Sequence, residues 1–492
     1  MNRHILVLGG GLTGLSSAFH ISRRFPDALV TLVEKSSRLG GWVSSDRVQV
    51  RDEHGHVAEI LLEAGPRSLR PNGQSVLELI NLLELKESVI TVPNSSSAAK
   101  NRYLQIPETQ GLVTLPNSLT SVLSPPMRTM LLPNILREPL RRGNRPKRIK
   151  DESLDSFMTR RFGPTFARVF GSALVHGIYA ADSRQLSVRA AFPSLWEMED
   201  RGWGSIVRGA LRPSWTPAQK DYNVGDVPDL MKGVSVYSFS DGISTLTDAL
   251  ASRLQLLHNV SILRKTTVSS IGVTSDNDVE VKLTNGQVLN PTHIVSALPL
   301  PVLDDLLTAS STLPHLKANP TSSVVVVNLV FPQSRGHLHP SGFGYLIPRP
   351  LTGYSLENSG ILGTVFDSCA LSAQDSDATN FTKMTVMMGG PNPISSSHTN
   401  VDAILKQLSI HLTAPDDLLK ALPDPVYVRT QNHINCIPTP TPGHLERMEE
   451  MKSTLAHGIW AGRMEVIGAG VRGVSISDCI ESGKRVAERL IS

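Results

Sequence analysis

The glycine spacing Gly9-x-Gly11-x-x-Gly14 constrains this chain more than any other feature of its sequence. It directly follows the apolar run 3–8, which predicts a short buried strand, and it opens a segment, 12–24, whose apolar residues recur with helical spacing. The first glycine permits a tight turn, the second lets the backbone approach a pyrophosphate, and the third lets helix and strand pack closely. Free N–H groups at the start of the helix favour bound phosphate.

An acidic residue completes this pattern. A second buried strand, 29–33, ends directly before Glu34, where a carboxylate can accept hydrogen bonds from a ribose. A bare glycine motif is weak evidence, but here strand, glycines, helix, strand and acid fall in register. The opening βαβ unit therefore predicts a site for the ADP half of a dinucleotide. The first strand begins by His4, so we expect no cleavable presequence.

Two later segments favour a flavin over a nicotinamide. In 38–42 (RLGGW), Arg38 can reach back to phosphate, and the glycine pair lets the chain pass close to the flavin; the alternative is an ordinary turn. In 63–67 (EAGPR), glycine and proline indicate a constrained loop, from which Arg67 could face the flavin or its phosphates. The alternative there is also a plain turn.

The C-terminal segment predicts a return to the same domain. Residues 458–462 (GIWAG) indicate a strand that ends at Ala461-Gly462-Arg463, and a helix begins near Ser475. The N-terminus of that helix could stabilise negative charge on a reduced flavin, or the helix could serve packing alone.

Composition excludes several classes of protein. The 492 residues are too many for one core and predict two or three domains. A net charge of +4 and the lack of a recognisable module argue against nucleic-acid binding. The scattered Cys369, Cys436 and Cys479 argue against a disulfide framework and against a metal site. No apolar run approaches the roughly 18–20 residues needed to span a bilayer.

One stretch is strongly basic. Seven cations fall within fourteen residues, opposed only by Glu138: Arg137, Arg141, Arg142, Arg145, Lys147, Arg148 and Lys150. Such a run is ordinarily a solvated face or loop. The alternative is contact with anionic lipid or with an acidic partner.

Taken together, these motifs resemble the amine-oxidase-like flavoproteins, and within them the eukaryotic, mitochondrial type of protoporphyrinogen oxidase. The resemblance runs over nearly the whole chain. It is carried by LVLGGGLTGL at 6–15, RLGGW at 38–42, GPRSLRP at 65–71, NRYL at 101–104, GIYAADSRQLS at 177–187, FPSLW at 192–196, GFGYL at 342–346, NCIP at 435–438 and DCIESG at 478–483.

The resemblance implies an α/β fold, α+β overall, in three parts. A Rossmann-type FAD-binding domain is built from both termini and a middle segment, beside a mixed-sheet substrate domain and an inserted helical domain that associates with a membrane. The expected limits are 1–75, 238–300 and 455–492 for the FAD-binding domain, 76–100 and 301–454 for the substrate domain, and 101–237 for the helical domain.

The implied reaction is oxidation of protoporphyrinogen IX to protoporphyrin IX, the penultimate step of haem synthesis. Six hydrogens leave in three two-electron cycles, and dioxygen reoxidises the flavin and gives hydrogen peroxide. The hard step belongs to the cofactor, so no catalytic side chain is assigned beyond the flavin, and an apolar pocket is expected. Cys479 lies inside a predicted helix, so the FAD is expected to be non-covalent.

The resemblance also implies partners and a location. The product passes to ferrochelatase, and the chain forms a homodimer. It attaches peripherally to the mitochondrial inner membrane from the intermembrane-space side, and the basic run follows apolar residues that suit such attachment. Those residues are Met130, Leu131, Leu132, Ile135 and Leu136.

Site residues carry over position by position. Arg102 would pair with a substrate propionate, or is a surface arginine. Phe343, Gly344 and Leu346, with Met387 nearby, would clamp the ring, or are plain core; Gly177 would leave space beside it, or marks a helix end. The implied cofactor contacts are Gly9, Gly10, Gly11, Leu12, Thr13, Gly14, Glu34, Lys35, Arg38, Gly41, Trp42, Gly65, Pro66, Arg67, Ser68, Val268, Gly462, Arg463, Val474, Ser475 and Ile476.

Two other functions compete with this one. The first is a flavin amine oxidase or carotenoid desaturase of the same fold. Amine oxidases favour an aromatic cage with a tyrosine near the C-terminus, whereas the last 60 residues here hold Trp460 but no tyrosine or phenylalanine. The second is a flavoprotein fold kept as a non-catalytic assembly or electron-transfer subunit, against which the intact cofactor motifs argue.

Overall fold

The fold comes from a computed structural model. It describes residues 3–107, 109–116, 127–141, 145, 148–213, 222–333, 336, 338–414, 417–419 and 421–490.

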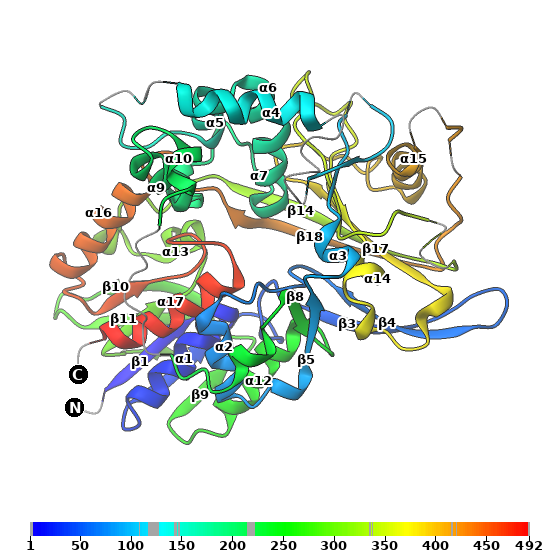
Figure 1. The fold of residues 1–492 in the computed structure, drawn as a ribbon. Coiled ribbons are helices and arrows are strands. Elements are labelled where there is room, and N and C mark those ends of the chain that lie inside the picture. The colour runs from blue at the N-terminus through cyan, green and yellow to red at the C-terminus, as the bar shows by residue number, and fades with distance from the viewer. Residues whose placement is uncertain are drawn as a thin grey trace.

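A five-stranded parallel sheet gathers strands from both ends and the middle of the chain. Its order is β19-β13-β1-β2-β9, with bounds Met464–Val466, His293–Ser296, His4–Leu8, Leu29–Val33 and Val260–Leu263. The two termini therefore lie close together at one side of the molecule (Figure 1). This arrangement confirms a cofactor-type parallel sheet built from both termini and a middle segment.

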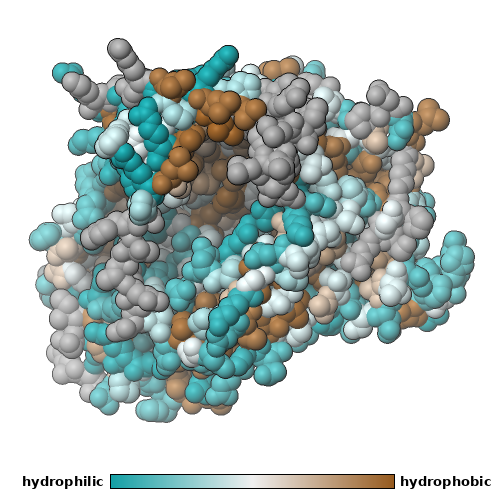
Figure 2. All heavy atoms as spheres, in the orientation of Figure 1, coloured by the Kyte–Doolittle hydropathy of each residue, from teal (hydrophilic) through white to brown (hydrophobic). Residues whose placement is uncertain are grey.

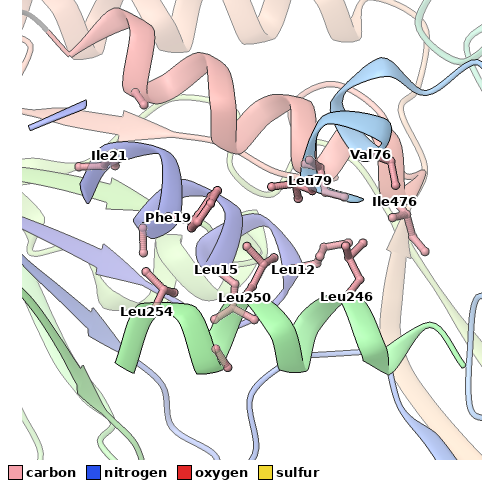
Figure 3. Packing of buried hydrophobic residues seen from close by; sticks show 14 of the residues in the cluster. Leu12, Leu15, Phe19, Ile21, Val76, Leu79, Leu246, Leu250, Leu254 and Ile476 are labelled. Atoms are coloured by element: carbon pink, nitrogen blue, oxygen red, sulfur yellow. The ribbon is translucent and has the colours of Figure 1, made fainter. Parts of the chain in front are cut away.

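Alternating residues of β1 face opposite sides of this sheet. Residues on both sides are buried, so the sheet has a core on each face. Ile5 and Val7 belong to a core of helices α1, α2, α12 and α17, whereas Leu6 and Leu8 belong to a second core. The helices of the first core are Leu12–Arg24, Gln74–Leu82, Ser244–Gln255 and Ile476–Arg489. Figure 3 shows how α1 and α12 interdigitate through Leu15 and Leu250.

The packing of α2 matters for the domain limits. Val76 and Leu79 of α2 lie in the first core, against Ile476 at the start of α17 (Figure 3). The expected domain limit at residue 75 would assign most of α2 to the substrate domain. The structure instead buries the apolar face of α2 against the cofactor layer. The domain limits as a set stay a prediction.

The second core is covered by a small antiparallel sheet and two helices. The elements are β10, Val268–Val273; β11, Val279–Leu283; β12, Val288–Leu289; α13, Leu300–Leu306; and α16, His444–His457. The turn at Asn285-Gly286 joins β11 to β12, and Gly286 has φ +87°, a conformation that glycine adopts without steric cost.

A seven-stranded mixed sheet forms the other large layer. Its order is β18-β14-β17-β16-β15-β6-β7, with bounds Tyr427–Pro438, Thr321–Phe331, Thr382–Gly389, Ile361–Val365, Gly344–Leu346, Tyr103–Leu104 and Val113–Thr114. Neighbouring strands are antiparallel except for β15 and β6. Helix α15, Val401–Leu412, packs on one face through Ile404 and Leu408. The expected mixed sheet is confirmed, although β6 and β7 come from the segment assigned to the helical domain.

Smaller elements join the two layers. They are the hairpin β3, Ser45–Arg51, with β4, Val57–Glu63; the pair β5, Val89–Pro93, with β8, Val234–Phe239; and the short helices α3, Ser97–Lys100, α11, Val227–Leu230, and α14, Asp367–Ala370.

Short helices form a third layer, which lies at the top of Figure 1. They are α4, Met127–Arg137; α5, Leu154–Phe162; α6, Pro164–Phe166; α7, Ser172–Tyr179; α8, Val188–Ala191; α9, Pro193–Arg201; and α10, Ile206–Ala210. Gly163, which has φ +100° and is followed by Pro164, separates α5 from α6. Of the described residues, no helix combines the length and apolarity needed to cross a bilayer.

A buried ion pair anchors this helical layer. The side chains of Arg161 and Glu138 are fully buried, and Arg161 Nε donates to Glu138 at 2.8 Å. Ser205 Oγ and the Ile206 N–H donate to the same carboxylate at 2.6 and 3.0 Å. Burial raises the pKa of Glu138, but these hydrogen bonds outweigh it and hold the pKa below its ordinary value.

The basic run is not a continuous solvated face, contrary to the simplest interpretation. Arg145 lies 3.7 Å from the Trp196 ring centroid and pairs with Glu199, and Arg141 donates to the Arg161 carbonyl at 2.8 Å. These two arginines are therefore internal supports. Arg137, Arg148 and Lys150 are exposed, whereas Arg142 and Lys147 lie outside the described residues.

Replacing Arg161 by methionine is expected to destabilise the protein by about 3–5 kcal/mol, because it leaves the Glu138 carboxylate buried without its cation. Chemical denaturation followed by circular dichroism measures the loss. Arg137→Met, on the exposed end of α4, is the matched control and should change stability by less than about 0.5 kcal/mol. Equal stability of the two variants would contradict the structural role of the pair.

Candidate functional site: a cofactor cradle against an apolar sheet face

The glycine loop between β1 and α1 has no room for side chains. Gly9 has φ +95°, and a Cβ built on Gly14 would lie 1.8 Å from the Gly9 carbonyl oxygen. A Cβ on Gly10 would lie 2.6 Å from Leu39. Gly11 is the N-cap of α1 and offers no side chain to its N–H groups. The first turn of α1, which includes Leu12 and Thr13, is therefore open to a phosphate.

Glu34 is fixed beside this loop. Its carboxylate accepts hydrogen bonds from the Gly10 and Ser36 N–H groups at 2.7 and 2.8 Å. The chain that leads into Val268 of β10 meets the same position, since the Thr266 N–H donates to the Glu34 carbonyl at 3.0 Å. The structure therefore brings the predicted Val268 segment to the acid, and Lys35 lies exposed next to it.

The 38–42 segment lies directly on the glycine loop. The Gly40 N–H donates to the Gly10 carbonyl at 2.8 Å, and a Cβ on Gly41 would lie 3.1 Å from Gly11 Cα. Arg38 donates to the carbonyls of its own loop, at 2.9 Å to Leu39 and also to Gly41. Its guanidinium thus shapes the loop, while its reach toward phosphate stays a prediction.

The 63–67 loop packs against the same segment. A Cβ on Gly65 would lie 2.9 Å from the Trp42 carbonyl oxygen. Glu63 accepts hydrogen bonds from Ser45 Oγ and the Ile243 N–H at 2.7 and 2.9 Å. Burial raises the pKa of Glu63 above its ordinary value. Pro66 is exposed and Ser68 is half-buried on either side of Arg67.

Arg67 is buried against the substrate sheet. It forms an ion pair with Asp367 at 2.8 Å, and the other carboxylate oxygen of Asp367 accepts from Thr385 Oγ1 at 2.7 Å. Asn328 Nδ2 of β14 donates to Thr385 Oγ1 at 2.8 Å and to the Glu63 carbonyl at 3.2 Å. Asp367 lies 300 residues from Arg67 in the chain.

His433 of β18 is a further contact that sequence reasoning missed. Its Nε2 lies 2.7 Å from the Ala64 carbonyl oxygen, and its ring makes an edge contact with Trp42 at 5.2 Å between centroids. It therefore ties both cofactor loops to the seven-stranded sheet. Neither His433 nor Asp367 belongs to a local motif, so only the fold could reveal them.

Three of the predicted substrate residues, Gly177, Leu346 and Met387, lie on the side of the sheet that α15 does not cover. Leu346, Gly363 and Met387 lie side by side across β15, β16 and β17. Gly177 of α7 packs on them, since a Cβ there would lie 2.9 Å from Leu346. Gly344 has φ +140°, and a Cβ there would lie 2.2 Å from the Thr364 carbonyl oxygen.

Arg102 lies at the edge of this region. Its guanidinium is 5.8 Å from the Phe343 ring centroid, and Phe343 packs in a small apolar cluster with Val236. Burial lowers the pKa of Arg102, and the charge of Arg70 lowers it further. In the part of the chain that the structure describes, no carboxylate pairs with Arg102.

The predicted C-terminal strand is wrong in position. Residues 458–462 form a turn after α16, because Ala461 and Gly462 have φ +47° and +77°, which a strand cannot adopt. The strand is Met464–Val466, and its Val466 end is level with the end of β1. Gly462 and Arg463 therefore precede the strand, at the opposite sheet edge from Gly9.

The Arg463 side chain forms hydrogen bonds with protein groups at that edge of the sheet. It donates to Asn277 Oδ1 at 2.9 Å and to the Trp460 carbonyl at 3.1 Å. The segment after the strand is the one that meets the glycine loop, since a Cβ on Gly468 would lie 3.7 Å from the Thr13 side chain. The repeated glycines of 468–470 were the available signal.

The predicted helix start near Ser475 is confirmed. Ser475 is the N-cap of α17 and forms a capping box with Asp478, so Val474, Ser475 and Ile476 sit at the helix N-terminus. Ser16 Oγ of α1 donates to the Ile480 carbonyl at 3.0 Å, which holds α17 against α1. Burial raises the pKa of Cys479 to about 11, so its thiol stays protonated.

Comparison with known proteins agrees with this geometry. Residues 12–491 match the model of the flavin containing amine oxidoreductase family. Human protoporphyrinogen oxidase is 34% identical over 99% of this chain and 98% of the human protein, and that of Schizosaccharomyces pombe is 32% identical over the same shares. The chain belongs to the protoporphyrinogen oxidase family.

A solved structure supports the fold of this family member. The protein from Exiguobacterium sp. 255-15, provisionally named a protoporphyrinogen oxidase, matches with a TM-score of 0.73 over 99% of this chain and 98% of that one. Its sequence identity is 21%, so this likeness concerns the fold alone.

This protoporphyrinogen oxidase family member is a flavin oxidoreductase with FAD as cofactor. The residues present fit the group: the open α1 N-terminus suits its phosphates, and Glu34 suits its ribose. The side-chain-free surfaces of Gly10, Gly14 and Gly41 leave a backbone cradle. Among the described residues, no cluster of three or more metal-ligating side chains occurs.

Gly14→Ala is expected to abolish retention of FAD, because its methyl group would collide with the Gly9 carbonyl oxygen and push α1 away from β1. The ratio of flavin to protein absorbance should fall below about a tenth of the wild-type value, while secondary structure by circular dichroism is kept. Gly336→Ala is the matched control, since a Cβ there meets nothing within 4 Å. Full FAD content in Gly14→Ala would contradict the assigned cradle.

Proposed function

We propose that this chain oxidises protoporphyrinogen IX to protoporphyrin IX with dioxygen as the final acceptor, the penultimate step of haem synthesis. The observation that carries the proposal is the apolar sheet face of Leu346 and Met387 beneath Gly177 of α7. It is bordered by Arg102, for which no carboxylate partner occurs among the described residues. An apolar face suits a macrocycle, and a free guanidinium suits its propionates.

The chain's own residues bind the substrate and orient it toward the cofactor. Gly177 lets α7 pack directly on Leu346, and Gly363 lies between Leu346 and Met387 in the sheet, so these residues form an apolar support for the substrate. Arg102 holds a propionate, with Phe343 packed under its guanidinium. Bound FAD would supply the two-electron oxidation of the substrate carbon, with dioxygen as the final acceptor and hydrogen peroxide as its product. Orientation of the substrate edge is therefore the protein's main contribution.

Loops 38–42 and 63–67 connect the two halves of this arrangement. Loop 38–42 lies on the glycine loop, and loop 63–67 packs against loop 38–42. His433 of β18 contacts both loops, and Asp367 at the start of α14 pairs with Arg67 of the second loop. The supports of the cofactor are thus also supports of the apolar face. This coupling fits a reaction in which substrate and cofactor must meet at a fixed distance.

The function is tested with purified holoenzyme, protoporphyrinogen IX prepared without oxygen, and then air. We expect porphyrin fluorescence to rise well above autoxidation, with three hydrogen peroxide molecules released per porphyrin, because each two-electron cycle reduces one dioxygen. Benzylamine and putrescine serve as alternative substrates. Porphyrin formation at the autoxidation rate by FAD-loaded protein, or turnover of the amines instead, would overturn the proposal.

We also propose that the helical layer attaches peripherally to a membrane. The mitochondrial inner membrane and its intermembrane-space side are proposed from the family resemblance. Hydrophobic residues gather over this layer, at the edge of a hollow, in Figure 2. Leu140, Trp203 and Leu211 are 82%, 74% and 83% exposed, and Arg208 donates to the Pro139 carbonyl, which places α10 beside residues 138–140. Exposed apolar side chains interleaved with arginines suit an anionic lipid surface.

The apolar residues of α4 that were expected to contact the membrane differ in exposure. Leu136 is 62% exposed, whereas Leu132 and Ile135 are only half-exposed, and the side chains of Met130 and Leu131 lie outside the described residues. Homodimer formation and transfer of the product to ferrochelatase are further proposals, which rest on the family resemblance.

Trp203→Ala combined with Leu211→Ala is expected to weaken binding to vesicles rich in anionic phospholipid by at least about tenfold, because each large side chain contributes roughly 1.5–3 kcal/mol when it leaves water. Co-sedimentation measures bound protein. Leu256→Ala, a control 78% exposed after α12, should bind as the wild type does. Unchanged binding of the double variant would remove these residues from the membrane contact.

A further inference from the structure

Arg70, like Arg102, is an arginine for which no acidic partner occurs among the described residues. Arg70 follows Leu69, which bridges to Tyr237 of β8, and precedes α2. Its side chain is exposed, and Nη1 lies 3.4 Å from the Ser235 carbonyl oxygen. Within the described ranges, neither Arg70 nor Arg102 forms an ion pair with a carboxylate. Arg67, three residues earlier, is neutralised by Asp367.

The two unpaired guanidinium groups flank one apolar cluster. Arg102 lies over Phe343, and Phe343 packs with Val236 of β8. Arg70 contacts the carbonyl of Ser235, the neighbour of Val236. The two charges are also close enough to interact, because Arg70 lowers the pKa of Arg102 beyond the effect of burial. Two like charges held together without an acid favour a ligand with two anionic groups.

We propose that Arg70 binds the second carboxylate of a dicarboxylate substrate whose first carboxylate is bound by Arg102. This inference rests on the proposed function, because the porphyrinogen carries two propionate chains on adjacent pyrroles. Two neighbouring cations match that edge of the molecule, where the two carboxylates hang from neighbouring pyrroles on either side of one carbon bridge. Arg70 and Arg102 together then determine the orientation of the porphyrinogen, and therefore which of its carbon bridges faces the cofactor.

The assignment gives Arg70 a specificity role that is separate from cofactor binding. Arg70 belongs to no contact of the glycine loop, and its own contact is to β8. Its loss should therefore leave FAD in place and weaken only ligands with a carboxylate at that position. A dimethyl ester of the same porphyrinogen has the same apolar surface without the charges, and it isolates the electrostatic contribution.

The test compares Arg70→Gln, Arg102→Gln and Arg51→Gln in the FAD-loaded enzyme. Arg51 is an exposed arginine at the end of β3 and is the matched control. With protoporphyrinogen IX, Arg70→Gln should raise KM roughly tenfold, as expected for a lost charge-assisted hydrogen bond, and change kcat less than about twofold. With the dimethyl ester, wild type and Arg70→Gln should agree within about twofold.

Binding of the product gives a readout that does not need turnover. Protoporphyrin IX titrated into each protein, followed by porphyrin fluorescence, should show the same roughly tenfold weakening in Arg70→Gln. Arg70→Lys, which keeps the charge, should recover most of the affinity. Failure of Arg70→Lys to recover it, with FAD content kept, would show that Arg70 acts through the shape of the loop.

Other results overturn the inference in distinguishable ways. A KM unchanged in Arg70→Gln but raised in Arg102→Gln would show that Arg70 is merely solvated, while the proposed function stands. An equal loss for substrate and ester would show a packing role. Failure of the wild type to oxidise the porphyrinogen would overturn the proposed function itself. Product titration would then still report whether Arg70 recognises a carboxylate.

Discussion

The architecture depends on the clamping of one short loop, 63–67, between the two large sheets. On one side, Gly65 packs against the Trp42 carbonyl, and the Glu63 carboxylate receives the Ile243 N–H. On the other, Asp367 pairs with Arg67. An ion pair buried to this degree requires good geometry and further hydrogen bonds to offset desolvation, and Thr385 supplies one of them. The cofactor layer and the substrate layer are thus held together by the cofactor's own supports.

Close approach of backbone to backbone accounts for the glycines at the contacts between the cofactor loops. Gly14 meets Gly9, and Gly41 meets Gly11, because backbone must approach backbone where a flat cofactor is to lie. On the substrate side, Gly363 lies between Leu346 and Met387 in the sheet, and Gly177 lets α7 pack directly on Leu346. The proposed reaction requires two flat molecules, the cofactor and the substrate, to lie close together, and glycine residues leave space for this approach.

Local signals predicted the elements that local forces determine. Helix 12–24 and strand 29–33 have the predicted bounds because periodicity, glycines and flanking turns agree there. The strand placed at 458–462 failed because the positive φ of Ala461 is set by the turn after α16 and not by residue type. Asp367 and His433 escaped prediction because their partners, Arg67 and Ala64, are hundreds of residues away in the chain.

The presence or absence of a carboxylate partner distinguishes arginines with a structural role from arginines that bind a ligand. The guanidinium groups of Arg67 and Arg161 are buried, and each has its own carboxylate, because an unpaired buried cation costs free energy. Arg102 is half-buried with a lowered pKa and no carboxylate partner in the described chain, so folding does not offset its desolvation. Such a charge is retained where an incoming anion completes the pair, and the position of Arg102 beside Phe343 places that anion at the edge of the apolar face.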